Sequence, residues 1–448
     1  MRTEHIDALA TIVGAENLTL DHQQRVSGSK DCYHFSPVLI PQLDGRAADV
    51  IARPQNQEQL RQLISWAAEH RVPVTPRGAG TGNYGQGVPL NGGLMINTKD
   101  LNQIVSLTKD EARAEAGVIL QEIERQAATV GAELRCFPST VPTSSTGGFI
   151  TGGSGGIGSI EWGMLRETDN VRHARILTVE EEPRVLDLPR EDLDGVLHNC
   201  GLTCFVAEVT LALAPKRQWY QYVIAFDDFY RALAGAQELA ENTSFKKRLV
   251  TAFEWPVPTF FVPLHKRGAF PEGCSVVFLY ADQPPSTIEP IAARLGGKVS
   301  FMEEPRSDAK RGTQIYDYTW NHTTQRALKA DPAYTYLQDR FELDRVVEQV
   351  RERKRHFPEM LEHIEFTRGG GQVIAGGLSL LRFESEARLN DLMAYCEADD
   401  ILIANPHTYY LDDDSRWYGE AFLRCKQDWD PHNLLNPGHL HALEDAAA

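Results

Sequence analysis

The sequence lacks the features of membrane-spanning, disulfide-rich and repetitive proteins. Its 448 residues contain no apolar run near 18 residues, no repeat of solenoid period and no low-complexity linker. The seven cysteines are scattered and odd in number, which argues against a disulfide scaffold and for a reducing compartment. The amino terminus is polar and does not resemble a signal peptide. We therefore expect a cytoplasmic protein of about two to four domains with no transmembrane segment.

Positive charge is also in short supply. The chain has 45 Lys and Arg against 62 Asp and Glu, a formal net charge of −17. Such a surface repels nucleic acid and anionic membranes, so we expect no nucleic-acid partner. Cys200 and Cys204 are close in sequence, but no second close pair follows to complete a zinc or iron–sulfur site. The sequence therefore predicts no bound metal.

Glycine, in contrast, is concentrated in two runs. "PRGAGTGNYGQG" covers residues 76–87 and "TGGFITGGSGGIG" covers residues 146–158. Successive N–H groups in glycine-rich loops form anion-binding sites, so the first run suits a diphosphate, with Thr81 and Arg77 as further partners. Neither the P-loop nor the Rossmann pattern fits this run. One such run alone could be a surface turn, but two runs between predicted strands favour one shared ligand with a flat ring system.

Periodicity divides the chain into segments of different character. A β-α-β unit is predicted over residues 49–76, and a strong strand over 204–215 ends at Pro215. Beyond it glycine becomes rarer and aromatic residues more frequent. There the pattern predicts a long amphipathic helical region over residues 338–361 and a strand pair over 370–383. The predicted fold class is α+β, with three parts: residues 1–215, 216–425 and 426–448.

Four segments, in order along the chain, resemble those of one flavoprotein superfamily. They are "ARPQNQEQLRQLISWAAEHRVPVTPRGAGTG" (52–82), "TGGFITGGSGGIGSIEWG" (146–163), "EDLDGVLHNCGLTCFVAEVTLALAP" (191–215) and "DPHNLLNPG" (430–438). They are similar to the flavoproteins with a PCMH-type FAD-binding domain, the vanillyl-alcohol oxidase-like superfamily. Within it, the D-lactate dehydrogenase and glycolate oxidase large-subunit branch is closest.

This resemblance implies a two-subdomain FAD-binding domain, an α/β cap domain with an antiparallel sheet that holds the substrate, and a C-terminal tail that returns to the FAD site. The residues it places around the diphosphate are Arg77, Gly78, Ala79, Gly80, Thr81, Gly82 and Asn83. Those it places along the flavin are Pro138, Ser144, Gly147, Gly148, Thr151, Gly152 and Gly153. Those it places at the adenine or flavin from the third and fourth segments are Val206, Glu208 and Asn436.

The chain departs from the superfamily in two informative ways. Members with covalently bound flavin often carry a histidine after the first Gly-Gly, where this chain has Thr81. We therefore expect FAD to be bound non-covalently, with attachment from the cap left open. The metal-dependent members carry a His-x-Gly-Asp-Gly-Asn-x-His motif in the cap, and this sequence does not contain it. Its absence agrees with the prediction of no metal.

Oxidation of an alcohol needs a base for the hydroxyl proton, and histidine is the usual choice. Two polar-aromatic clusters in the predicted cap suit a pocket wall, "YDYTWNH" (316–322) and "NPHTYY" (405–410). Each cluster could equally be part of the cap core. The candidate catalytic residues are His322, His407, Tyr318 and Tyr409, with Arg368 as a partner for a substrate carboxylate.

The leading hypothesis is an FAD-linked oxidase or dehydrogenase that oxidises a small 2-hydroxy acid or alcohol by hydride transfer to the flavin. It needs a small-molecule substrate and an electron acceptor, either oxygen or a carrier. One alternative is a flavin-binding subunit of a larger complex without turnover of its own. Another is a binding protein for a different diphosphate. Whether the chain forms a homo-oligomer is left open.

Overall fold

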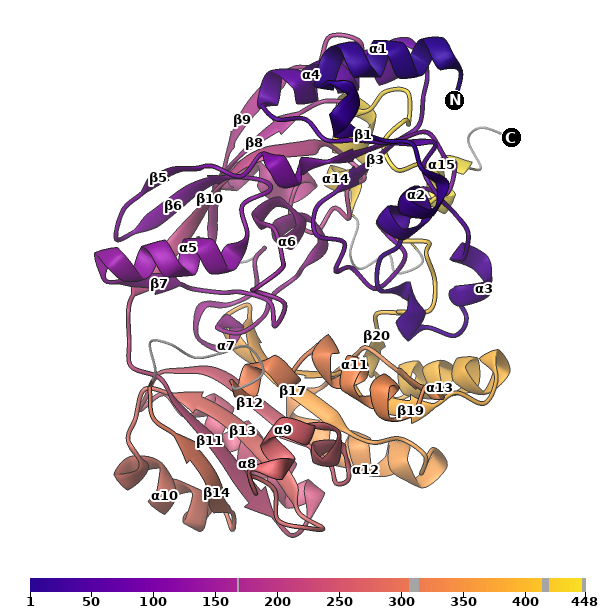
Figure 1. Ribbon diagram of the computed structural model, residues 1–448. Coiled ribbons are helices and arrows are strands. Elements are labelled where there is room, and N and C mark those ends of the chain that lie inside the picture. Colours follow the sequence, from indigo (N-terminus) through magenta and orange to yellow (C-terminus); the bar gives the residue numbers. More distant parts are fainter. Residues whose placement is uncertain (167–168, 306–313, 413–418, 445–448) are drawn as a thin grey trace.

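The computed structural model describes residues 1–166, 169–305, 314–412 and 419–444 (Figure 1). It confirms the α+β class: two small sheets lie in the first half of the chain, and one large antiparallel sheet lies in the second half. Figure 1 shows the two parts one above the other, with the segment before Pro215 above and the large sheet below. Within the described residues, none of the helices combines the length and apolar composition that crossing a bilayer requires.

The first sheet contains the predicted β-α-β unit. Its strands, in spatial order, are β1 (Leu18–Thr19), β2 (Val50–Ala52), β4 (Leu94–Asn97) and β3 (Val74–Arg77). Helix α4 (Gln57–Glu69) connects β2 to β3, and both strands run parallel to β4. The Asn56 side chain caps α4 by accepting from the Gln59 N–H, and the apolar face of the helix packs on the sheet. The first glycine run begins as β3 ends.

The second sheet is organised around its longest strand, β10 (Phe205–Pro215), which is buried at every position before Pro215. Its other strands are β5 (Ile104–Leu107), β6 (Glu111–Glu115), β7 (Ala132–Leu134), β8 (Val171–Leu177) and β9 (Val185–Pro189). The helices of this half, besides α4, are α1 (Thr3–Val13), α2 (His22–Ser29), α3 (Ile40–Leu43), α5 (Leu120–Ala127), α6 (Thr146–Gly152) and α7 (Ser159–Trp162). Strands β8 and β9 form an antiparallel hairpin.

The large sheet of the second half has eight strands. In spatial order they are β14 (Lys298–Glu303), β11 (Tyr220–Phe226), β13 (Ser275–Ala281), β12 (Lys247–Phe253), β17 (His363–Gly369), β18 (Gln372–Gly377), β16 (Asp339–Phe341) and β20 (Leu402–Ile403). Strands β15 (Tyr334–Tyr336) and β19 (Leu380–Arg382) form a separate pair. The helices here are α8 (Phe229–Glu241), α9 (Val262–Lys266), α10 (Pro285–Arg294), α11 (Asn321–Ala330), α12 (Val346–His356) and α13 (Glu386–Ala398).

The two faces of the large sheet differ because successive side chains on a strand point to opposite sides. One face is apolar and packs against α8, α10, α12 and α13, with Phe366, Ala375 and Phe341 among its buried residues. The alternate positions on β17, β18 and β16 include Glu365 and Arg340, and they line a cavity shared with the first half of the chain. Helix α7 closes part of this side by packing on β12 and β17.

The sequence prediction was wrong in two places that affect the site. The expected helical region over 338–361 begins as strand β16, since Asp339–Phe341 pair with both β18 and β20, and the helix starts only at Val346. The second glycine run was not predicted to contain a helix, but its first seven residues form α6. The Ser145 side chain caps this helix by accepting from the Gly148 N–H at 3.3 Å.

The segment after the large sheet returns to the first. Helix α14 (Glu420–Trp429) leads into a stretch in which Val74 N donates to Leu434 O and Asn436 N donates to Val74 O, both at 2.7 Å. Lys426 is buried and donates to Asp430 at 2.5 Å and to Leu435 O at 2.8 Å. A short helix, α15 (His441–Glu444), follows. Residues about 350 positions apart thus form one layer behind the first glycine run.

Candidate functional site

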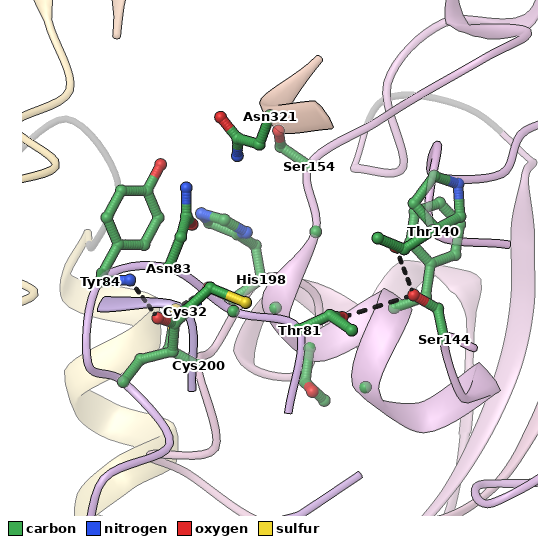
Figure 2. Close-up of a pocket in the computed structure, with 18 of the residues that line it drawn as sticks. Cys32, Thr81, Asn83, Tyr84, Thr140, Ser144, Ser154, His198, Cys200 and Asn321 are labelled. Carbon is green, nitrogen blue, oxygen red and sulfur yellow. Dashed lines mark hydrogen bonds between the residues drawn. The ribbon is translucent and has the colours of Figure 1, made fainter. Parts of the chain in front are cut away.

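A cavity of about 590 Å³ lies where the two halves of the chain meet (Figure 2). The first half contributes both glycine runs and the loop from His198 to Val206. The second half contributes the start of α11 and the open face of β16, β17, β18 and β20. One end of the cavity is therefore walled mainly by backbone, and the other by polar side chains.

The first glycine run forms a tight loop over a buried arginine. Gly80 and Gly85 have φ of +68° and +75°, a left-handed conformation that side chains rarely adopt. The Arg77 guanidinium packs directly under Gly80, where a Cβ would overlap it, and one of its nitrogens donates to Lys30 O. Its other terminal nitrogen is buried with no hydrogen-bond partner among the described residues. A buried cationic N–H without a partner is costly, and an anionic ligand would satisfy it.

Asp31 faces the same loop. Its carboxylate accepts from the backbone N–H of Tyr33 at 2.9 Å and of Gly87 at 3.2 Å. Burial raises the pKa of Asp31 to about 6, against these hydrogen bonds and the nearby charge of Arg77. Asp31 thus fixes the returning end of the loop through its contact with Gly87.

The second glycine run presents bare helix backbone to the cavity. Gly147, Gly148 and Gly152 all line it, and a Cβ built on Gly152 would meet no atom within 4 Å. Beside them three hydroxyls form a chain, with Thr140 and Ser144 oxygens 2.6 Å apart and Thr81 3.4 Å from Ser144 (Figure 2). Bare backbone beside a hydroxyl chain leaves room for a wide, flat ligand that hydrogen-bonds along one edge. Together with the unpartnered Arg77 nitrogen, this wall fits a dinucleotide that carries a diphosphate and a ring system.

Most residues expected around FAD line this cavity. Fifteen of the seventeen do so: Arg77, Gly78, Ala79, Gly80, Thr81, Gly82, Asn83, Pro138, Ser144, Gly147, Gly148, Thr151, Gly152, Gly153 and Val206. Glu208 and Asn436 lie behind it. The Glu208 carboxylate is occupied by Arg113 at 2.6 Å, Arg175 at 3.3 Å and Gln57 at 2.5 Å. Asn436 donates to Gln86 O at 2.7 Å and so supports the first loop from outside.

Of the residues considered for catalysis, His322 alone lines the cavity. It stands in the first turn of α11, next to Asn321 and close to Gln325, which line the cavity as well. His322 Nδ1 donates to Asp317 O at 3.1 Å. A carbonyl can only accept, so the neutral ring carries its proton on Nδ1 and has Nε2 as its basic nitrogen.

The other candidates lie elsewhere. His407 is buried outside this cavity, with Nε2 donating to Tyr336 O and Nδ1 facing the Ser36 hydroxyl, each at 2.8 Å. Burial lowers the pKa of His407 to about 4. Tyr318 is fully buried, and burial raises its pKa to about 12. Tyr409 packs in a small core cluster, and Arg368 donates to Ile160 O and Gly371 O.

Several charged residues of the cavity were not predicted from the sequence, among them Arg340 on β16 and Glu365 on β17. Arg340 is exposed and forms no hydrogen bond or ion pair with any described residue. Glu365 is almost fully buried and accepts three hydrogen bonds, from Trp320 N at 2.7 Å, from His363 Nε2 at 2.9 Å and from the Thr251 hydroxyl. Glu365 thereby fixes Trp320, whose φ of +53° directs the chain into α11.

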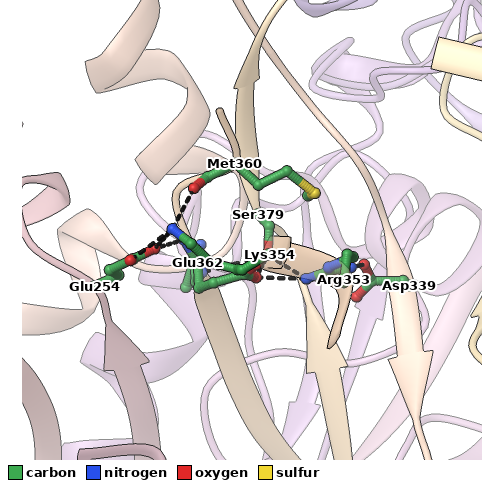
Figure 3. Close-up of polar contacts among 8 residues, drawn as sticks. Glu254, Asp339, Arg353, Lys354, Met360, Glu362 and Ser379 are labelled. Carbon is green, nitrogen blue, oxygen red and sulfur yellow. Dashed lines mark hydrogen bonds and ion pairs between the residues drawn. The ribbon is translucent and has the colours of Figure 1, made fainter. Parts of the chain in front are cut away.

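A buried ion network anchors the strand that carries Arg340 (Figure 3). Arg353 of α12 pairs with Asp339 of β16 and with Glu362, all three side chains being fully buried. The Ser379 hydroxyl donates to Glu362 at 2.7 Å, and Lys354 pairs with Glu254 at 2.6 Å. Removing one partner of such a network leaves an uncompensated buried charge, so β16 is held firmly against α12.

Comparison with known proteins bears on the first half of the chain. Residues 48–186 match a family model described as "FAD binding domain". Residues 48–186 are an FAD-binding domain. FAD is therefore the cofactor, as the resemblance predicted. The domain begins just before β2 and ends in β9, so it contains both glycine runs.

Curated relatives point to the same group. The chain is 31% identical over 163 residues to the glycolate oxidase subunit GlcD of Bacillus subtilis, covering 36% of this chain and 33% of that one. It is 30% identical over 142 residues to the D-lactate dehydrogenase of Archaeoglobus fulgidus, covering 30% and 31%. It is 25% identical over 254 residues to the GlcD of Escherichia coli, covering 53% of this chain and 50% of that one. The matches thus span a third to a half of these relatives, and the expected kinship with this branch is confirmed.

The fold comparison covers nearly the whole chain. A solved structure of alkyldihydroxyacetonephosphate synthase superposes with a TM-score of 0.76 over 98% of this chain and 85% of that one, at 15% sequence identity. The likeness shows that the FAD-binding domain and the large sheet share one overall fold with that protein. Among the described residues, no group of three His, Cys, Asp or Glu side chains is placed to hold a metal ion.

Proposed function

We propose that the protein is an FAD-linked oxidase or dehydrogenase that oxidises a small 2-hydroxy acid. The observation that carries this proposal is the second end of the cavity, where Arg340 and His322 line the same space as the glycine-walled FAD site. The relatives named above are a glycolate oxidase subunit and a D-lactate dehydrogenase, both acting on small hydroxy acids by their names. We propose that residues 1–215 and 426–448 hold the cofactor and that residues 216–425 hold the substrate.

Each residue has a definite task in this proposal. The Arg340 guanidinium binds the substrate carboxylate. Its planar group of N–H donors matches the two carboxylate oxygens in geometry. His322 Nε2 accepts the hydroxyl proton, while the hydrogen bond from Nδ1 to Asp317 O fixes the orientation of the ring. Asn321 and Gln325 of the same helix, which also line the cavity, offer amide groups. FAD, when bound, supplies the two-electron acceptor for the hydride that leaves the carbon.

The cofactor-binding residues named above are proposed to hold FAD without a covalent bond, since Thr81 stands where a linking histidine would be. Acid precipitation of the yellow protein should then release FAD into the supernatant. Colour that remained in the pellet would show attachment. We further propose a cytoplasmic location and reoxidation by oxygen or a carrier.

To test this, the protein is mixed anaerobically with 2-hydroxy acids of increasing size, and the loss of flavin absorbance is measured. Primary alcohols of the same length, which lack the carboxylate, are the matched control. We expect bleaching by the acids and much slower bleaching by the alcohols. If no hydroxy acid bleaches the flavin, the chain is better described as a flavin-binding subunit without turnover of its own.

A further inference from the structure

One row of directly paired residues crosses the large sheet on its cavity side. Glu365 of β17 pairs with Gly376 of β18, Gly376 pairs with Arg340 of β16, and Arg340 pairs with Leu402 of β20. Directly opposed residues point to the same face, and all four line the cavity. An acidic and a basic residue therefore flank a glycine at the substrate end.

The two charged neighbours do not fill the space above this glycine. They are two strands apart, so their backbones lie about 10 Å from each other. Glu365 is fixed in place by its three hydrogen-bond donors. Arg340 has no ion pair with Glu365 or with any other described residue. The row thus forms a slot with a fixed carboxylate on one side and an available guanidinium on the other.

Nothing in the protein itself accounts for a glycine at position 376. Its φ lies outside the left-handed region, so the backbone does not need glycine there. A Cβ would meet only the backbone oxygens of Asp339 at 3.7 Å and Glu365 at 3.9 Å, which is ordinary contact. The adjacent Gly377 is different, because a Cβ there would overlap the Asp339 carboxylate. Glycine weakens a strand interior, and where neither conformation nor packing requires it, close approach of a ligand is the remaining reason.

We infer that Gly376 is the floor of the substrate slot and determines which substrates fit, an inference that rests on the proposed function. A small carboxylate would pair with Arg340 and lie across Gly376 toward Glu365. The side chain at position 376 limits the bulk of the substrate, since any carbon added there occupies the slot itself. The chemical class that fits is a short 2-hydroxy carboxylate without a bulky substituent.

The test uses the FAD-loaded protein with Gly376→Ala and Gly376→Val. Oxalate, a small unreactive carboxylate, is titrated by calorimetry and by its effect on the flavin spectrum. We expect Gly376→Val to weaken oxalate binding by about 10–100-fold and Gly376→Ala by less. Flavin content should remain unchanged, and the melting temperature should stay level or rise, because a side chain favours the strand. Gln372→Val is the control, placing the same residue on the exposed end of β18 outside the cavity.

The possible outcomes distinguish failure of the inferred substrate slot from failure of the proposed reaction. Oxalate binding to Gly376→Val within twofold of the wild type would overturn the slot. Failure of the wild type to bind oxalate would overturn the slot and the proposed function together. If oxalate binds and Gly376→Val weakens it, but no hydroxy acid bleaches the flavin, the slot stands as a carboxylate site and only the proposed reaction fails.

Discussion

The two ends of the cavity are built in different ways. The FAD end uses main chain, because glycines 80, 147, 148 and 152 line it with bare backbone. The proposed substrate end uses a row of residues on paired strands, Arg340, Gly376 and Glu365. Backbone recognition leaves a local pattern in the sequence, whereas a row across a sheet does not. Substitutions at each end test whether that end works as this difference implies.

Gly80→Val tests the backbone end of the cavity. A β-branched residue at a φ of +68° is strained by about 1–2 kcal/mol, and its Cβ displaces the Arg77 guanidinium as well. We expect flavin content, measured by absorbance of the purified protein, to fall at least about tenfold. Gly45→Val is the matched control, since Gly45 has a φ of +84° but no atom within 4 Å of its Cβ position. Full flavin in Gly80→Val would show that this loop does not hold the cofactor.

His322→Ala tests the side-chain end. If His322 takes the substrate proton, the rate of flavin reduction in stopped flow should fall by about 10²–10⁴-fold with flavin content unchanged. His407→Ala is the control, because His407 lies outside the cavity with both ring nitrogens hydrogen-bonded. A large loss in the control with little loss at His322 would transfer the role to residues 405–410. If neither variant slows flavin reduction, neither histidine takes the substrate proton.

Arg340→Met should raise KM for a 2-hydroxy acid by about 10–100-fold, the usual contribution of a hydrogen bond to a charged group. The effect on kcat should be smaller, because the carboxylate is bound in both the ground state and the transition state. Arg382→Met serves as the control, since Arg382 is an exposed arginine paired with Asp331 outside the cavity. Equal KM changes in the two variants would remove Arg340 from substrate binding.

The smallest expected effect is a loss of folding stability as the pH falls. Burial lowers the pKa of His198 and of His407 to about 4, so between that value and 6.5 the unfolded chain binds protons that the folded protein does not. Stability is therefore lost as the pH falls, by about 2 kcal/mol per histidine between about pH 7 and pH 5. Asp31, whose pKa is raised to about 6, acts in the opposite direction over the same range.

The difference between wild type and His407→Asn isolates one histidine, because the contribution of Asp31 cancels. Urea unfolding at both pH values should show a pH dependence smaller by about 2 kcal/mol in the variant. If stability depends on pH to the same extent in the wild type and in His407→Asn, then His407 is not buried as a neutral ring.

The contrast between the two ends of the cavity also explains which parts of the site could be predicted from the sequence. The FAD end was predictable because its glycines and Thr81 are clustered in two short runs. Arg340 was missed because the apolar and charged residues of 338–361 follow a helical spacing, and only pairing with β18 and β20 makes Asp339–Phe341 a strand. Propensity could not show this, since strand pairing is decided by distant partners. His322 was predicted to lie in a pocket wall because it stands in a cluster of polar and aromatic residues, and it does line the cavity.

The layer behind the first glycine run has a consequence for how the protein is made. Val74 is hydrogen-bonded to Leu434 and Asn436, and Gln86 to Asn436, across about 350 residues of intervening chain. During synthesis, at roughly 5–20 residues per second, the loop therefore waits tens of seconds for these contacts. Loading of FAD is then a late event that follows synthesis of residues 216–425. Chains that stall before residue 430 should be colourless even though every glycine of both runs has already been translated.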